Sequence, residues 1–276
     1  MTIKQKLKTA VVTGGSQGIG FNIAKILAKS GYNIIVCSRK LSDALIAKKQ
    51  IELYGVKCLA LRTDISRYAE CKSLIRETVR NFSRIDLLVN NAAIQGPVGK
   101  FWLNDLKDWE KTVAINLMGT VYMSHLVIPY MLKQKRGIIL NLSGGGGAYA
   151  RPLFSAYGSS KTAVLRLTET LAEELKDTYI KVIAIAPGAT WTNMTRQILN
   201  SKSVGKSIIT ELKTLRKTNG TPFNKLEKLI KYLINKESDK LSGKLVHVNE
   251  LEKVMKIDNN LYKESGLLRR TNYFKE

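Results

Sequence analysis

Tyr157 and Lys161 are the residues of this sequence whose types and spacing best suit proton transfer. A side chain four positions further along a helix lies on the same face. A phenol has an ordinary pKa of about 10, and a neighbouring ammonium group favours the phenolate. Such a pair can give a proton to a developing alkoxide and take it back in the reverse direction. The pair therefore predicts acid–base chemistry at a carbon–oxygen bond.

Spacing alone does not single out this pair, because Tyr68 with Lys72 and Tyr232 with Lys236 have the same separation. At least two of the three pairs must be ordinary helix-surface pairs. The context of Tyr157 differs, since its expected helix, residues 156–177, follows a glycine-rich loop at the end of an expected strand. That position is a common one for ligand-binding residues in α/β proteins.

Short apolar runs rich in β-branched residues alternate with amphipathic stretches of helical length. This pattern predicts an α/β protein with a parallel sheet. Right-handed crossovers then give a three-layer, doubly wound Rossmann fold, with helices on both faces of a seven-stranded sheet and ligands at the carboxyl ends of the strands. The expected strands are residues 10–13, 33–37, 57–61, 87–90, 137–142, 181–186 and 244–248.

A glycine-rich segment, Thr13 to Gly20, joins the first expected strand to the first expected helix. Glycines at such a turn let the backbone approach a pyrophosphate, whose charge is then stabilised by the positive end of the helix. A plain strand-to-helix turn is the alternative interpretation. The residues expected to contact a dinucleotide here are Gly14, Ser16, Gln17, Gly18, Ile19 and Gly20.

The spacing T-G-x-x-x-G-x-G resembles that of the short-chain dehydrogenase/reductase family, and further motifs lie where that family has them. The resemblance extends from Thr9 to Thr192, with a weaker similarity at residues 241–248, and Ala92-Ala93 is a minor departure. It implies a nicotinamide-dependent enzyme that reduces a ketone or oxidises a secondary alcohol. The other matching motifs are Asp64, Asn90-Asn91-Ala92, Asn116, Tyr157 to Lys161 and Pro187-Gly188.

The resemblance also implies roles in cofactor binding. Asp64 and Ile65 would border the adenine, Asn90 would steady the strand end, and Thr192 would contact the nicotinamide amide. Without the resemblance, a turn or helix cap before Ser66 is the alternative interpretation of Asp64. Ala92, Pro187 and Gly188 complete the expected cofactor contacts.

In the catalytic group, the resemblance implies that Tyr157 is the acid/base and that Lys161 lowers its pKa and holds the nicotinamide ribose. Asn116 would bind a water that completes the proton path, although a buried helical asparagine bonded to backbone is the ordinary alternative. The family usually has a carbonyl-orienting serine thirteen residues before the tyrosine, where this chain has Gly144. Either the intervening loop is one residue longer and Ser143 has this role, or the role is missing. We favour Ser143.

Cofactor choice depends on the residues after the second expected strand. A carboxylate there would bind the ribose hydroxyls of NAD and repel a 2′-phosphate. This chain has Ser38 followed by Arg39, whose planar guanidinium suits a phosphate, although a surface cation is also possible. Gln17 lies in a position that some NADP-using relatives fill with a basic residue. NADP(H) is therefore favoured, and NAD(H) is the alternative.

The 276 residues are predicted to form a single domain, with a substrate lid at about residues 193–222 and a C-terminal extension at about 250–276. A solvated surface insertion is the alternative to the lid.

The N-terminus has no signal-peptide pattern and we find no membrane-spanning apolar run, so we expect a cytoplasmic protein. Cys37, Cys58 and Cys71 are expected to be reduced and packed as small hydrophobic residues, and His125 and His247 do not suggest a metal site.

The formal net charge of +23 comes from lysines and arginines spread along the chain. Such a charge either attracts an anionic partner or reflects a lysine-rich genome composition. Nucleic-acid binders usually gather basic residues beside aromatics or in a recognition helix, so the partner we expect is a phosphate-bearing ligand. A sugar or nucleotide-sugar substrate is slightly preferred, by analogy with the C-terminal tail of polysaccharide-pathway dehydrogenases. The alternatives are a 3-oxoacyl-(acyl-carrier-protein) reductase-like enzyme and a non-catalytic dinucleotide-binding scaffold. A homodimer or homotetramer is expected from the resemblance.

Overall fold

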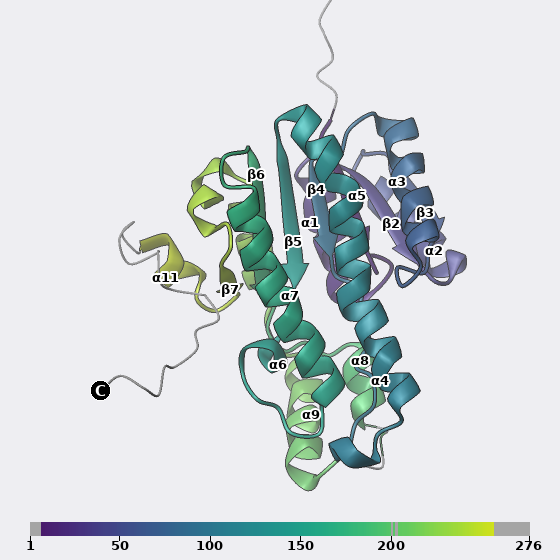
Figure 1. The fold of residues 1–276 in the computed structure, drawn as a ribbon, viewed down its shortest axis with the longest axis vertical. Helices are drawn as coiled ribbons and strands as arrows, with labels where there is room; N and C mark the ends of the chain where they lie inside the picture. Colours follow the sequence, from purple (N-terminus) through teal and green to yellow (C-terminus); the bar gives the residue numbers. More distant parts are fainter. Residues whose placement is uncertain (1–6, 200, 202–203, 257–276) are drawn as a thin grey trace, which may run out of the picture.

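The computed structural model describes residues 7–199, 201 and 204–256, which fold around one seven-stranded sheet (Figure 1). All strand pairs are parallel, and the strand order is β3-β2-β1-β4-β5-β6-β7. This confirms the predicted doubly wound Rossmann-type fold. The strands are β1 (Thr9–Thr13), β2 (Asn33–Ser38), β3 (Cys58–Arg62), β4 (Leu87–Asn90), β5 (Gly137–Leu142), β6 (Ile180–Ala186) and β7 (Leu245–His247).

The helices fill the connections between strands. Their bounds are α1 (Gly18–Lys29), α2 (Leu41–Glu52), α3 (Tyr68–Phe82), α4 (Leu106–Val113), α5 (Gly119–Gln134), α6 (Gly145–Ala148), α7 (Ser155–Glu174), α8 (Asn193–Leu199), α9 (Lys206–Thr218), α10 (Phe223–Leu233) and α11 (Leu251–Lys256). Shorter turns are η1 (Phe101–Leu103), η2 (Ala114–Met118), which is a π-helix, and η3 (Lys236–Leu241).

Alternate residues of each strand build two separate cores, one on each face of the sheet. Val12 packs with α1, α2 and α10, whereas its neighbour Val11 packs with α3, α5 and α7. The strands are therefore apolar on both sides, as a buried parallel sheet requires. This explains why they appear in the sequence as continuous apolar runs.

Residues 106–134, which run from α4 through η2 to α5, are long and apolar enough to cross a membrane by length and composition alone. Our expectation that no such segment exists therefore does not hold for this stretch. In the fold, the stretch packs on the sheet and its Met123, Val127 and Met131 are fully buried. Its apolar composition is accounted for by a place in the protein core.

The predicted lid region contains α8 and α9, which lie beyond the carboxyl ends of the strands (Figure 1). A backbone bridge between Thr190 and Gly220 joins the two ends of this segment. The segment packs against the start of α7 in a third apolar cluster, which includes Phe154, Ile198 and Leu212 and is separate from the sheet cores. Of the predicted C-terminal extension, the structure describes α11, and residues 257–276 lie outside the described residues.

The three cysteines are free and buried, as predicted. Burial raises the pKa of each of the Cys37, Cys58 and Cys71 thiols to about 12. A thiol with so high a pKa is not a nucleophile at neutral pH. The cysteines therefore act as small apolar residues.

Candidate active site

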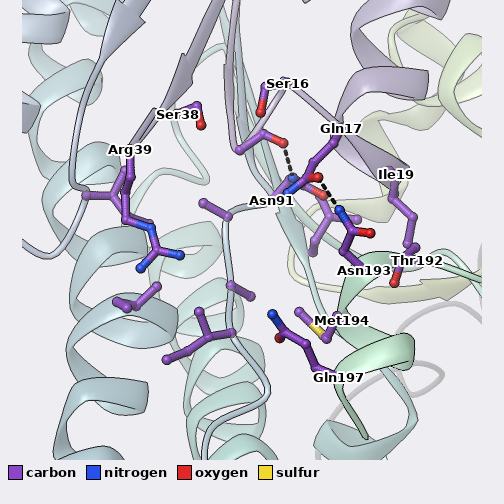
Figure 2. A pocket seen from close by; sticks show the side chains of 18 of the residues that line it. Ser16, Gln17, Ile19, Ser38, Arg39, Asn91, Thr192, Asn193, Met194 and Gln197 are labelled. Atoms are coloured by element: carbon purple, nitrogen blue, oxygen red, sulfur yellow. Dashed lines mark hydrogen bonds between the residues drawn. The ribbon is translucent and has the colours of Figure 1, made fainter. Parts of the chain in front are cut away.

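A cavity of about 470 Å³ opens at the carboxyl ends of the strands, a size within the range of small-molecule sites. Its walls come from the β1–α1 loop, the ends of β2 and β4, helix α7 and the segment after β6. Figure 2 shows Arg39 on one side of it and Thr192, Asn193 and Met194 on the other. The predicted residues that line it are Gly14, Ser16, Gln17, Gly18, Ile19, Ser38, Arg39, Asp64, Ile65, Ala92, Ser143, Tyr157, Lys161, Pro187 and Thr192.

Four predicted residues, Gly20, Asn90, Asn116 and Gly188, are not among the lining residues. The two glycines permit close packing behind the wall. A Cβ atom on Gly20 would lie 2.3 Å from the side-chain nitrogen of Asn91, and one on Gly188 would lie 2.1 Å from the hydroxyl oxygen of Thr221. Both positions therefore exclude any side chain.

Asn91 holds the glycine-rich loop in place. Its side-chain amide donates hydrogen bonds to the carbonyl oxygens of Thr13 (2.9 Å) and Gly14 (3.1 Å). The Thr13 hydroxyl oxygen in turn accepts from the backbone N–H groups of Asn91 (3.0 Å) and Ala92 (3.1 Å). The loop is thus fixed in shape. The sequence showed Asn91 within a motif, but we had not assigned it a contact.

The glycine loop leaves backbone exposed where a pyrophosphate would lie. Gly14 has a φ of 60°, and a Cβ there would approach the Cα of Ala92 to 3.0 Å. The chain then enters α1 directly, with no acidic residue in its first turn. Exposed backbone and the positive end of a helix together suit a diphosphate, so these residues fit a dinucleotide.

Asn90 lies in a buried chain of amides beneath the cavity. Its side-chain nitrogen donates to Asn141 Oδ1 (2.9 Å) and Ser124 Oγ (3.1 Å), and Asn141 donates to Thr168 Oγ1 (2.9 Å). These bonds tie β4 and β5 to α5 and α7. Satisfied buried networks of this kind make a wall rigid.

At the β2 side of the cavity, Asp64 lies beside Arg39. The Asp64 carboxylate accepts hydrogen bonds from the Ser66 N–H (3.0 Å) and hydroxyl (2.7 Å). Burial works to raise the pKa of this carboxyl, but the Ser66 hydrogen bonds and the charges of Arg39 and Arg67 hold it below its usual value. Asp64 therefore makes the turn contact that we had weighed as the alternative, and it also borders the cavity.

The Tyr157 and Lys161 side chains both reach the cavity from α7. The Lys161 ammonium donates to the Leu142 carbonyl oxygen at 2.7 Å and lies 5.9 Å from the centroid of the Tyr157 ring. Burial lowers the pKa of Lys161 to about 8. Burial also raises the pKa of Tyr157 above its ordinary value, with the charge of Arg151 opposing the rise. The Tyr157 phenol is thus protonated at neutral pH, as a proton donor must be.

The Asn116 side chain has a structural set of contacts in the π-helical turn η2. Its oxygen accepts from the Ile94 N–H (2.9 Å), and its nitrogen donates to the Ile94 carbonyl (3.0 Å) and to Ser160 Oγ (3.0 Å). Both amide hydrogens are therefore in use. A contact from the Asn116 side chain to a water in the proton path stays a prediction.

Gly144 borders the tyrosine, and Ser143 lines the cavity. A Cβ on Gly144 would lie 3.1 Å from the Tyr157 hydroxyl oxygen. The Ser143 hydroxyl is covered and has no hydrogen-bond partner among the described residues, and it lies where a Cβ on Gly147 would be 2.7 Å away. The Ser143 hydroxyl belongs to the cavity wall, and its role in orienting the carbonyl stays a prediction.

The segment after β6 supplies contacts that the sequence did not reveal. The Asn193 amide donates to Gln17 Oε1 at 2.5 Å, which joins α8 to the glycine-rich loop (Figure 2). Met194 and Gln197 of α8 line the same cavity, as does Trp191. These residues belong to no motif that is recognisable in the sequence, so only the fold shows that they line the cavity.

Comparisons with known proteins agree with this geometry. Residues 8–203 match the family model described as short chain dehydrogenase. The chain is 31% identical over 245 residues to a 3-oxoacyl-(acyl-carrier-protein) reductase FabG of Staphylococcus epidermidis, covering 88% of this chain and 97% of that one. It is 35% identical over 194 residues to a 3-oxoacyl-(acyl-carrier-protein) reductase of Synechocystis, covering 69% and 77% of the two chains.

Solved structures of similar proteins have the same fold. An actinorhodin polyketide ketoreductase with NADPH superposes with a TM-score of 0.79 at 26% identity, covering 88% of this chain and 95% of that one. An NAD⁺-bound xylitol dehydrogenase gives a TM-score of 0.79 at 25% identity, covering 87% and 96%. The chain belongs to the short-chain dehydrogenase/reductase family and is an oxidoreductase that acts on CH–OH and C=O groups.

Proposed function

We propose that this chain is an NADP(H)-dependent reductase that converts a ketone to a secondary alcohol, with Tyr157 as the proton donor. The observation that carries the proposal is that one cavity contains both the glycine-rich loop and the Tyr157–Lys161 pair. The dinucleotide supplies the hydride. The protein supplies the proton and holds the reacting groups in place.

In this mechanism the Tyr157 hydroxyl gives its proton to the carbonyl oxygen as negative charge develops there. The raised pKa keeps Tyr157 protonated at neutral pH until that moment. Lys161, fixed by the Leu142 carbonyl, places a positive charge beside the phenolate that remains. The proton returns to Tyr157 along the same path in alcohol oxidation.

The proposed preference for NADP(H) rests on Ser38 and Arg39. Ser38 offers no carboxylate to repel a 2′-phosphate, and its hydroxyl accepts from the Lys40 N–H at 3.3 Å. Arg39 is exposed at the mouth of the cavity, where its planar guanidinium can grip a phosphate. Asp64 is the one carboxylate among the described lining residues, and it is engaged by Ser66.

A 3-oxoacyl thioester is the substrate class that the curated relatives favour, since those named above are 3-oxoacyl-(acyl-carrier-protein) reductases. The sugar preference rested on the C-terminal tail, which lies outside the described residues. We therefore place the thioester first and the sugar second. A homo-oligomer and a cytoplasmic location remain proposals that rest on the family.

The test is a fluorescence titration of the purified protein with NADPH and NADH, followed by a ketone-reduction assay. We expect tighter NADPH binding, and we expect Tyr157→Phe to keep that binding while losing about 10²- to 10⁴-fold in turnover. Tyr68→Phe, in the surface pair with the same spacing, is the matched control and should keep full activity. Unchanged turnover in Tyr157→Phe would remove Tyr157 from the reaction.

A further inference from the structure

The chain makes a tight turn, Arg151 to Phe154, directly before α7. The Phe154 N–H donates to the Arg151 carbonyl at 3.3 Å, with Pro152 and Leu153 between them. Proline at the second position and a φ of 72° at Leu153 fit a type II turn, whose third residue is usually glycine. The Leu153 carbonyl accepts from the Gly99 N–H at 2.9 Å. The turn is thus pinned to the β4–α4 connection despite an unfavourable residue.

This turn stacks the Arg151 side chain on an aromatic ring. The central carbon of its guanidinium lies 4.2 Å from the centroid of the Phe154 ring, and Phe154 is completely buried. Stacking uses the flat face of a guanidinium and leaves the N–H groups at its edge available. None of the described carboxylates forms an ion pair with Arg151. The half-buried Arg151 side chain is therefore held in one orientation, and its N–H donors have no carboxylate partner among the described residues.

Arg151 stacks on a ring that packs with the reacting tyrosine. Phe154 is the cap of α7, Tyr157 follows in its first turn, and the two side chains belong to one apolar cluster. The Arg151 charge also opposes the rise in the pKa of Tyr157 that burial causes. On the side of Gly144 and Gly146, glycines without side chains border the Tyr157 ring and hydroxyl. The two glycines thus leave space beside the Tyr157 phenol, and the Arg151 guanidinium is held in place nearby.

We propose that Arg151 binds an anionic group, a carboxylate or a phosphate, which the substrate carries close to the carbonyl that is reduced. A planar guanidinium with free edge donors binds such oxyanions through two parallel hydrogen bonds. Because the turn already holds Arg151 in place, little ordering is needed when the anion binds. The inference rests on the proposed function, and for the same site it places an acidic ketone ahead of the neutral 3-oxoacyl thioester that the relatives favour.

The experiment uses methyl ketones that carry a terminal carboxylate, with from one to four methylene groups between the two, and the methyl ester of each. Acid and ester differ by one charge and share the same ketone. Affinities are measured by calorimetry on the NADPH complex of the full-length Tyr157→Phe variant, which does not turn over. A neutral 3-oxobutanoyl thioester of N-acetylcysteamine is included as a further uncharged ketone.

At the best chain length we expect the acid to bind about 10- to 100-fold more tightly than its ester, the range for a charge-assisted hydrogen bond. Arg151→Gln, added to this background, should remove the difference and leave ester affinity unchanged. Arg151→Lys should keep only part of it, because a lysine keeps the charge and loses the fork. Arg76→Gln removes the same charge from an exposed site in α3 and should change nothing.

Equal affinity for acids and esters at every length would overturn the proposal, as would selectivity that survives Arg151→Gln. Preference for the neutral thioester over all acids would also overturn it. Wild-type turnover separates this result from the proposed function. If the acids bind selectively through Arg151 and no ketone is reduced, the reductase assignment fails and the anion site stands.

Discussion

Gly144 lies directly beside Tyr157, and a Cβ on Gly144 would lie 3.1 Å from the Tyr157 hydroxyl oxygen. A serine at this position would place a second hydroxyl beside the first. Two donors stabilise a developing alkoxide better than one, and removal of one such donor typically costs about 10²- to 10³-fold in rate. Compared with a serine at position 144, the glycine therefore lacks a hydrogen-bond donor as well as side-chain volume.

The first prediction compares two substitutions at that position. Gly144→Ser and Gly144→Ala add the same Cβ contact with Tyr157, but only serine adds a donor. We expect kcat/KM for a small methyl ketone to be about 10²-fold higher in Gly144→Ser than in Gly144→Ala. Steady-state kinetics of the two variants measure this ratio. Equal values would mean that a hydroxyl at position 144 does not reach the carbonyl oxygen.

The second prediction concerns Ser143, whose hydroxyl is buried without a partner. We expect Ser143→Ala to lose about 10²-fold in turnover, because the hydroxyl that orients the carbonyl is removed. It should also raise the free energy of unfolding by about 1 kcal/mol, because an unsatisfied buried hydroxyl is removed. Turnover assays and urea unfolding measure the two effects, and turnover within about threefold of wild type would show that Ser143 does not orient the carbonyl.

The third prediction follows from the burial of Lys161, which is 3% exposed and has its pKa lowered to about 8. Between about pH 8 and 10.5 the unfolded chain still binds the proton that the folded chain has lost, so stability rises with pH in this window. Below about pH 8, Lys161 is protonated in the folded protein, and this buried positive charge lowers the free energy of unfolding. Lys161→Met should therefore be inactive yet more stable at pH 7, by about 1–3 kcal/mol.

Urea unfolding of Lys161→Met at pH 7 and near pH 10 tests this prediction, and the gain should shrink at the higher pH. The exposed Lys72→Met in α3, which has the same spacing from a tyrosine, is the control and should show no such dependence. A Lys161→Met variant that is less stable at pH 7 would show that the hydrogen bond to Leu142 outweighs the burial cost.

The fourth prediction concerns Asp86, a buried carboxylate at the opposite end of the sheet. It accepts from Arg84 Nε at 2.7 Å and from the Thr9 N–H at 2.8 Å, which ties β4 to β1. Asp86→Ala leaves both donors without their acceptor and should cost about 3 kcal/mol in urea unfolding. The exposed pair of Lys48 and Glu52 is the contrast, and Glu52→Gln should cost less than about 0.5 kcal/mol.

The fifth prediction tests the 2′-phosphate contact. Arg39→Gln should weaken NADPH binding about 10- to 100-fold and leave NADH binding unchanged, because a charge-assisted hydrogen bond to the phosphate is lost. Ser38→Asp should reverse the preference. Fluorescence titration at fixed salt measures both, with the exposed Arg80→Gln as the charge control. Equal losses for the two cofactors would show that Arg39 does not contact the phosphate.

The fold could be predicted from the sequence because its signals are local. Strands buried on both faces appear as continuous apolar runs, and the glycines between Thr13 and Gly20 mark a turn whatever surrounds them. The same holds for most cavity-lining residues, which lie at the ends of those strands. Gly20 and Gly188 were placed in the site by motif but act behind it, since sequence does not separate a lining residue from a packed one.

The contacts that sequence missed depend on distant segments. Asn193 meets Gln17 across 176 positions, and nothing local to either residue indicates it. The contact between Gly144 and Tyr157 was also beyond sequence, because spacing cannot tell which of two adjacent residues at a strand end borders the tyrosine. The stacking of Arg151 on Phe154 needed the positive φ of Leu153, a conformation that leucine rarely adopts.

The segment between Thr190 and Gly220 leaves the main body and returns to it at one place, where the Thr221 N–H also donates to the Ala189 carbonyl at 2.8 Å. Its apolar residues join a cluster that is apart from the sheet and that includes Phe154 and Tyr157. Because the ends are already joined, a change of length between them adds little loop-closure entropy. The segment is in effect an exchangeable cassette, in which new substrate contacts can arise by mutation or be grafted from relatives, as long as the Asn193–Gln17 bond and the packing against Phe154 and Tyr157 are kept.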